Sequence, residues 1–236
     1  LIRKAQGVRV VSKRILDSFK KHNIVLKCEP QVLPIRITFP VPKVPDMRSA
    51  PFPEFKFTIL MMSRLEKEKR IQDALIAFKT VLQIYSHAGL VIAGEGREKA
   101  TLLKYAQDLD VAGSVRFLGW VSDTSNLLAS ADVFLSTSEY EGYGMSVIEA
   151  GLAGVPVVTT DVGVSGEVLV DGRNSYIVSV GDTMGVANRI IDLITHNQVR
   201  SVLSQALRED ITARIPSLTQ YTDVYVQGLE ETLKNY

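Results

Sequence analysis

The spacing of apolar and polar positions changes repeatedly after about residue 55, and this spacing predicts the secondary structure. Short, continuously apolar runs predict buried strands at 57–62, 90–93, 115–118, 132–135, 155–158 and 175–178. Between the first two runs, Ala74, Leu75, Phe78 and Leu82 recur at helical spacing within residues 71–84. The same spacing predicts helices at 99–109, 123–129, 145–153, 182–196, 199–214 and 218–233, with a helical turn at 166–170. Strands that alternate with helices are typical of a doubly wound parallel α/β sheet.

The chain before residue 55 has a different pattern. Residues 8–12 are strand-like, an amphipathic helix follows them, and residues 29–39 form another extended stretch. Five of the nine prolines then lie within residues 40–53. Such a density of proline disfavours regular structure and predicts a stiff linker over residues 40–54. We therefore expect a domain boundary near residue 54.

Composition and charge narrow the classes of partner. The 236 residues carry a formal net charge of +1, so the chain has no field that would attract nucleic acid. Cys28 is the only cysteine, which excludes an intrachain disulfide and a cysteine-based metal cluster and is compatible with a cytoplasmic location. Basic residues on the first helix favour a solvated face over a surface that binds anionic membranes. The chain begins with Leu1 rather than Met, so we expect it to be part of a longer protein.

Residues 136–160 carry the clearest functional signal. An apolar run leads into a polar loop in which Gly142 and Gly144 allow close approach of a ligand to the backbone. Because this loop follows a strand of a parallel sheet, we expect it at the edge where ligands bind. Glu141 lies in the loop, and Glu149 lies on the helix that follows. Carboxylates beside the free N–H groups of a helix start suit a ligand with both hydroxyls and phosphates. Each acid taken alone is more often an ordinary solvated residue.

The first strand-to-helix connection, residues 62–70, should lie at the same edge of the sheet. Arg64 can bridge phosphate oxygens with its planar guanidinium, and Lys69 adds a second positive charge. Together they could stabilise a departing diphosphate, which would be electrostatic rather than acid–base catalysis. The alternative is a solvated run of charges.

The run EGYGMSVIEAGLAGVPVV closely resembles the Glu-x7-Glu region of the retaining glycosyltransferases of family 4, which have the GT-B fold. Arg64 and Lys69 keep the spacing of that family's Gly-Arg-Leu and Lys-Gly pattern, although Ser63 and Arg70 replace its glycines. The similarity extends over most of residues 56–236. It implies a Rossmann-like carboxy-terminal half of a GT-B fold in residues 55–215. Residues 1–39 would be the tail of the amino-terminal acceptor domain, and residues 216–236 a helix that crosses back toward it.

The resemblance also implies a role for each site residue. Arg64 and Lys69 would hold the diphosphate, Glu141 the sugar hydroxyls, and Glu149 the ribose hydroxyls. Backbone N–H groups would cradle the sugar and phosphates, and Val121 would meet the base; the N–H groups are those of Gly142, Tyr143, Gly144, Met145 and Ser146. No metal and no tightly bound cofactor is expected, since the two basic side chains supply the positive charge.

Two further residues receive structural interpretations. Trp120 follows a strand end and lies next to Val121, but a lone tryptophan is more often part of the packing than a stacking platform. Glu167 follows a glycine where the family has an acid at a helix start, so we interpret it as a structural acid at the start of its own helical turn.

The function implied is transfer of a sugar from a nucleoside diphosphate sugar to an acceptor, with retention of anomeric configuration. The acceptor, a saccharide or a lipid-linked molecule, would bind the missing amino-terminal domain, so the chain alone should transfer little or nothing. A peripheral contact with the inner face of a membrane stays open. Two alternatives remain: a non-catalytic GT-B module that binds nucleotide sugar, and a GT-B-fold nucleotide-sugar epimerase.

Overall fold

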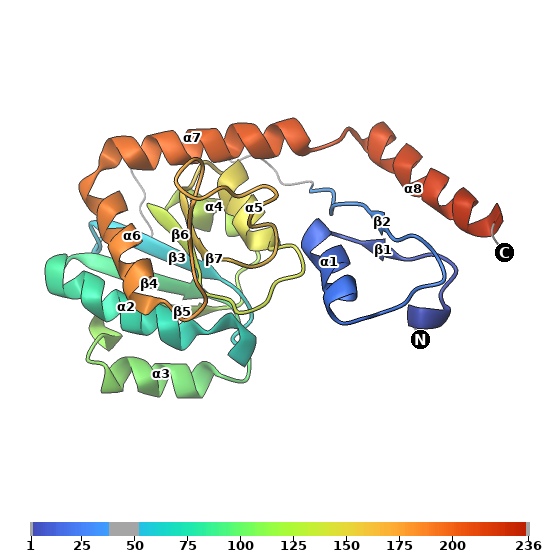
Figure 1. The fold of residues 1–236 in the computed structure, drawn as a ribbon. Coiled ribbons are helices and arrows are strands. Elements are labelled where there is room, and N and C mark those ends of the chain that lie inside the picture. Colours follow the sequence, from blue (N-terminus) through green and yellow to red (C-terminus); the bar gives the residue numbers. More distant parts are fainter. Residues whose placement is uncertain (1, 38–51, 235–236) are drawn as a thin grey trace.

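The computed structural model describes residues 2–37 and 52–234. Most of the expected proline-rich linker, residues 40–51, therefore lies outside the described residues, as do Tyr236 and residues 38–39 of the extended stretch. Figure 1 shows a large α/β unit and, beside it, a small unit built from the amino-terminal elements and the last helix.

The large unit is built on a six-stranded parallel sheet with the order β5-β4-β3-β6-β7-β8. Its strands are β3 (Phe57–Met62), β4 (Ala88–Ala93), β5 (Val115–Gly119), β6 (Val133–Ser136), β7 (Val157–Thr160) and β8 (Tyr176–Val178). Strand β3, the first of this sheet in sequence, lies between β4 and β6. The strands that follow it are therefore added first on one side of β3 and then on the other. This order confirms the predicted Rossmann-like doubly wound sheet and places its switch point beside the end of β3.

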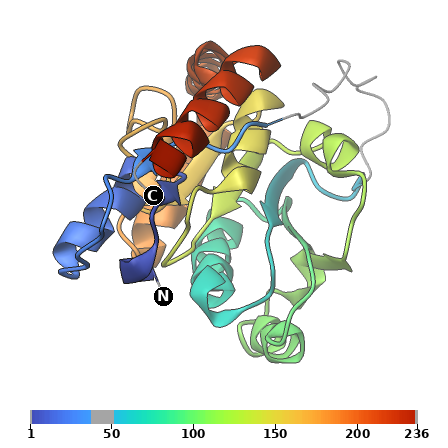
Figure 2. The ribbon, with the colours of Figure 1, turned by 90° about the vertical axis from the view of Figure 1, so that its right-hand side faces the viewer.

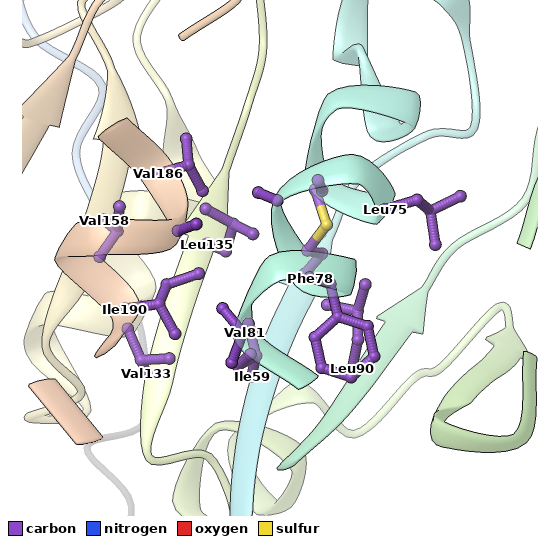
Figure 3. Close-up of a cluster of buried hydrophobic side chains, with 14 of the residues drawn as sticks. Ile59, Leu75, Phe78, Val81, Leu90, Val133, Leu135, Val158, Val186 and Ile190 are labelled. Atoms are coloured by element: carbon purple, nitrogen blue, oxygen red, sulfur yellow. The ribbon is translucent and has the colours of Figure 1, made fainter. Parts of the chain in front are cut away.

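Helices cover both faces of the sheet, and each face has its own apolar core (Figure 1). The helices are α2 (Ile71–Ile84), α3 (Lys99–Asp108), α4 (Thr124–Ala129), α5 (Met145–Leu152), α6 (Thr183–Thr195) and α7 (Asn197–Arg214). Two short 3₁₀ helices, η2 (Lys67–Lys69) and η3 (Ala112–Ser114), precede α2 and β5. In one core, Phe78 and Val81 of α2 pack over the sheet near Ile190 of α6 (Figure 3). The other core joins α5 to α7 and the opposite face of the sheet.

The small unit contains η1 (Ile2–Lys4), two short parallel strands, β1 (Arg9–Val10) and β2 (Gln31–Val32), and α1 (Lys13–Lys21). The last helix, α8 (Leu218–Lys234), lies on this strand pair and away from the large sheet (Figures 1 and 2). Gln31 donates a side-chain hydrogen bond to the Val224 carbonyl at 3.2 Å, and the Arg9 guanidinium lies 5.1 Å from the centre of the Tyr225 ring. None of the described helices combines the length and the apolar character that a membrane span requires.

Residues 166–170 do not form the expected helical turn. They form irregular turns with an isolated bridge between Ser165 and Leu169. Gly163 and Gly166 both have left-handed backbone conformations, with φ of +58° and +81°. A right-handed helix cannot pass through such residues, and the glycines that resembled a helix start are instead the corners of a turn.

Candidate functional site

A cavity of about 670 Å³ opens at the carboxyl ends of the central strands, beside the switch point of the sheet. Met62 and Ala93 line it at the ends of β3 and β4, and the loop from β6 to α5 closes another side. It brings together nine of the predicted site residues: Arg64, Lys69, Val121, Glu141, Tyr143, Gly144, Met145, Ser146 and Glu149. Gly142 is the predicted residue that does not line it. The prediction that loops after parallel strands meet at one edge of the sheet therefore placed these residues, from separate parts of the chain, near one another.

Lys69 and Glu141 form an ion pair at the floor of the site. The Lys69 Nζ lies 2.6 Å from Glu141 Oε1, and the two side chains are 11% and 19% exposed. The Ser138 hydroxyl donates a second hydrogen bond to the same oxygen at 2.8 Å. Thr137 donates to the carbonyls of Lys69 and Arg70, each at 3.0 Å, and so joins the connection after β3 to the loop after β6. A largely buried pair with several hydrogen bonds is well ordered, because each partner left alone would be an uncompensated charge.

Arg64 also lines the cavity, but its side chain is exposed. Its side chain is 72% exposed, and its guanidinium donates to Glu68 at 3.0 Å. An exposed ion pair of this kind contributes little to stability, so the Arg64 guanidinium can leave Glu68 and bind an anionic ligand at little cost. The next residue, Leu65, is fully buried, which fixes the point from which the Arg64 side chain extends.

The loop from β6 to α5 presents backbone N–H groups to the cavity. Gly144 is the residue before α5 and has φ +92°, a left-handed conformation that favours glycine. Within residues 2–37 and 52–234, the N–H groups of residues 142–146 donate to no protein acceptor. The carbonyls of Gly142 and Tyr143, in contrast, accept from Ser12 and Val164. Free N–H groups at the start of a helix form a site that favours anions.

Glu149 lies on α5 and lines the same cavity. It is partly buried, and burial raises the pKa of its carboxyl above the usual value. Burial likewise raises the pKa of the Tyr143 phenol. A carboxylate without a salt-bridge partner among the described residues is suited to accept hydrogen bonds from ligand hydroxyls.

The structure corrects two interpretations. Trp120 is not part of the packing: the residue is 80% exposed, and it lines the cavity next to Val121. Glu167 is not at the start of its own helical turn; its carboxylate accepts the N–H of Arg14 at 3.0 Å, in the first turn of α1. It is therefore a helix-start acid for a helix that precedes it by more than a hundred residues, which sequence spacing could not show.

Sequence reasoning also missed wall residues that come from other segments. Ile35 reaches the cavity from the amino-terminal stretch, and Ser63 and Thr124 complete its sides. Ser63 has a buried hydroxyl without a hydrogen-bond partner among the described residues. Among the described residues, no three side chains of the types His, Cys, Asp and Glu gather in a way that could hold a metal ion.

Comparison with protein families gives a match for residues 44–210, to the model described as "Glycosyl transferases group 1". Among curated proteins, N-acetyl-alpha-D-glucosaminyl L-malate synthase of Bacillus anthracis is 33% identical over 177 residues, which are 73% of this chain and 46% of that protein. The lipopolysaccharide core biosynthesis glycosyltransferase LpsE of Rhizobium meliloti is 33% identical over 171 residues, 72% of this chain and 49% of that protein. The chain thus spans about half the length of the curated relatives it matches.

Solved structures share the fold at lower identity. Anabaena Alr3699/HepE in complex with UDP-glucose superposes with a TM-score of 0.86 and 21% identity, over 96% of this chain and 65% of that one. TarM superposes with a TM-score of 0.82 and 22% identity, over 96% of this chain and 44% of that one.

Proposed function

The chain belongs to the group 1 glycosyl transferases, and from this we propose that it forms the donor-binding half of a glycosyltransferase that uses a nucleoside diphosphate sugar. The observation that carries the proposal is the cavity that joins two cations, two carboxylates and the free N–H groups of a helix start. These groups match the three chemical parts of such a donor, which are a diphosphate, a ribose and a sugar.

We assign the diphosphate to Arg64 and Lys69 and to the N–H groups from Gly142 to Ser146. Glu149 accepts hydrogen bonds from the ribose hydroxyls, Glu141 accepts them from the sugar, and Val121 meets the base. The exposure of Trp120 at the cavity wall makes it a second candidate for contact with the base. These assignments are supported by the shared cavity, in which the cations, the carboxylates and the N–H groups all line one space.

We further propose that the enzyme belongs to family 4 and transfers the sugar with retention at the anomeric carbon. The bond between that carbon and the diphosphate oxygen breaks, and the acceptor hydroxyl bonds to the same face of the sugar. The acceptor proton passes to a phosphate oxygen of the leaving group. Arg64 and Lys69 stabilise the negative charge that develops on the diphosphate. Glu141 is not assigned as a covalent nucleophile, because a same-face transfer assisted by the leaving group needs no glycosyl-enzyme intermediate.

The domain organisation is part of the proposal. Residues 1–39 are the tail of an acceptor domain, residues 40–54 a linker, residues 55–215 the donor domain, and residues 216–236 the helix that returns to the acceptor domain. The contacts of α8 with β1 and β2 support this organisation. A saccharide or lipid-linked acceptor would bind the other half, so this chain should bind donor and need the remaining protein for transfer.

Calorimetric titration with UDP, GDP and ADP tests the donor site directly. UDP comes first, because Alr3699/HepE was crystallised with UDP-glucose. We expect saturable binding of one nucleotide, weakened about tenfold or more by Glu149→Ala and unchanged by Glu230→Ala, which alters an exposed acid of α8. Failure of the full-length protein to bind any of the three would refute the proposal. Product analysis with that protein separates transferred sugar from an epimer or from no reaction.

A further inference from the structure

Ser12 links the small amino-terminal unit to the glycine loop of the cavity. Its side chain is 1% exposed, and its hydroxyl donates to the Gly142 carbonyl at 3.1 Å, across 130 positions of sequence. The same oxygen accepts the N–H of Ile15 at 3.3 Å and so caps the start of α1. In Figure 1 the loop between β6 and α5 reaches toward the start of α1. The hydroxyl therefore uses its single donor for the loop and one of its two acceptor lone pairs for the helix.

The direction of the Gly142 carbonyl decides where the next N–H points. The described residues contain no cis peptide bond, and in a trans peptide the C=O and the N–H point to opposite sides. Because the Gly142 carbonyl points toward the Ser12 hydroxyl, the N–H of Tyr143 points away from Ser12. In the same way, the N–H of Val164 donates to the Tyr143 carbonyl at 3.2 Å, so the N–H of Gly144 points away from Val164. Tyr143 and Gly144 both line the cavity, and their N–H groups donate to no acceptor among the described residues, so both groups are available to a ligand there.

A second set of contacts from α1 holds the turn that supports this loop. The Arg14 guanidinium donates to the Asp161 carbonyl at 2.9 Å, to Asp161 Oδ1 at 2.6 Å and to the Ser165 carbonyl at 3.0 Å. Between these two residues, the Cα of Gly163 lies so close to the Tyr143 carbonyl that a Cβ would be only 2.7 Å from that oxygen. The start of α1 therefore forms hydrogen bonds both to the loop between β6 and α5 and to the turn at residues 161–165.

We propose that Ser12 is a positioning residue for the anion-binding backbone of the donor site. By fixing the Gly142 carbonyl, it orients the N–H groups of Tyr143 and Gly144 for the diphosphate before the ligand arrives. Preorganised donors avoid the cost of reorienting when charge arrives. The inference rests on the proposed function, and it assigns to the amino-terminal unit a part in donor binding as well as any part in acceptor binding.

The test must separate positioning from helix capping, because Ser12→Ala removes both hydrogen bonds. Ser12→Thr keeps a hydroxyl that can cap α1 and donate to Gly142. Asp182→Ala is the matched control: Asp182 caps α6 by accepting the N–H of Gly185 at 2.8 Å and does not line the cavity. It removes a helix cap of the same kind at a distance from the donor site.

The affinities of these three variants and of the unchanged chain are measured for UDP and for uridine, by calorimetry and by ligand-observed NMR. We expect Ser12→Ala to weaken UDP binding about five- to tenfold, the loss expected for one preorganised hydrogen bond, and to leave uridine binding unchanged. Ser12→Thr should restore UDP affinity, and Asp182→Ala should change neither ligand.

Unchanged UDP affinity in Ser12→Ala would overturn the inference, and so would an equal loss for UDP and uridine or an equal loss in Asp182→Ala. In each of these results the unchanged chain still binds UDP, so the proposed function survives. If the unchanged full-length protein binds none of UDP, GDP and ADP, the donor site itself is refuted and the role of Ser12 falls with it.

Discussion

Gly163 offers a way to move the donor loop without touching any residue that would contact the ligand. Its backbone is left-handed, with φ +58°, and a Cβ built on it would lie 2.7 Å from the Tyr143 carbonyl oxygen and 3.0 Å from the Glu141 Cβ. Neither obstacle is the end of a flexible side chain. Gly163→Ala must therefore push the loop that carries Glu141 and the free N–H groups toward the cavity, or distort the turn behind it.

The magnitude has two parts. A left-handed conformation costs a residue with a Cβ about 1–2 kcal/mol. The clash adds to this, because a carbon–oxygen contact is comfortable near about 3.3 Å, so the atoms must separate by roughly 0.5 Å; overpacking of this kind costs about 1–3 kcal/mol. The expected loss of unfolding free energy is about 2–5 kcal/mol. Since a misplacement of about 1 Å can reduce activity a hundredfold, a shift of half that size should weaken UDP binding about tenfold.

Gly172→Ala is the control for backbone strain. Gly172 is also left-handed, with φ +70°, but a Cβ there would meet no atom within 4 Å. Urea unfolding gives the stability of the two variants, and calorimetry gives their affinity for UDP. Gly172→Ala should lose only the conformational part, about 1–2 kcal/mol, and bind UDP like the unchanged chain.

Equal UDP affinity in the two variants would refute the reasoning, even if Gly163→Ala were the less stable. It would mean that the turn yields and the loop stays, so that the contact between Gly163 and Tyr143 does not control the position of the N–H groups. A loss of affinity confined to Gly163→Ala would tie the geometry of this turn to donor binding.

Three other substitutions test separate parts of the site. Burial raises the pKa of Glu149, so its ionisation destabilises the fold once the pH exceeds the pKa that the carboxyl has in the unfolded chain. Glu149→Gln should therefore raise the urea midpoint at about pH 7.5 and leave it unchanged at about pH 4. The same substitution should still weaken nucleotide binding. Arg64→Ala in the full-length enzyme should lower kcat about 10²- to 10³-fold, as loss of one charge-stabilising donor does, whereas Arg208→Ala, on the exposed face of α7, should leave kcat unchanged in the same transfer assay. Arg70 has φ +47° where the related family has glycine; Arg70→Gly should therefore be more stable than Arg70→Ala by about 1 kcal/mol in urea unfolding, the reverse of the usual order of Gly and Ala.

Much of the large α/β unit could be predicted from hydrophobic spacing, because β3, β4, β6 and β7 are buried along their whole length and the helices that cover them each have one apolar side. The expected strand at 57–62 and the expected helix at 71–84 agree with β3 and α2 at both ends. The meeting of Lys69 and Glu141 was also within reach, since both follow strands that neighbour each other in a parallel sheet. Local pattern and one topological rule were enough for these features.

The remaining features depend on contacts between segments far apart in sequence. No spacing rule could show that Glu167 caps α1 or that Ser12 holds Gly142, because the residues of each pair lie more than a hundred positions apart. The exposure of Trp120 likewise depends on how the chain turns after β5, where Gly119 has φ +72°. Such contacts exist only once the two units of the chain are placed side by side.

The ion pair between Lys69 and Glu141 has a consequence for how a donor would be recognised. In the structure each charge is already satisfied by the other, at 2.6 Å and largely out of water. A phosphate that takes Lys69 alone would leave the Glu141 carboxylate buried without its partner, which is a costly state. A ligand that brings phosphate to Lys69 and hydroxyls to Glu141 at the same time satisfies both groups. We therefore expect the pair to favour the intact nucleotide sugar over either of its halves, and this expectation follows from burial and distance rather than from the identity of the base.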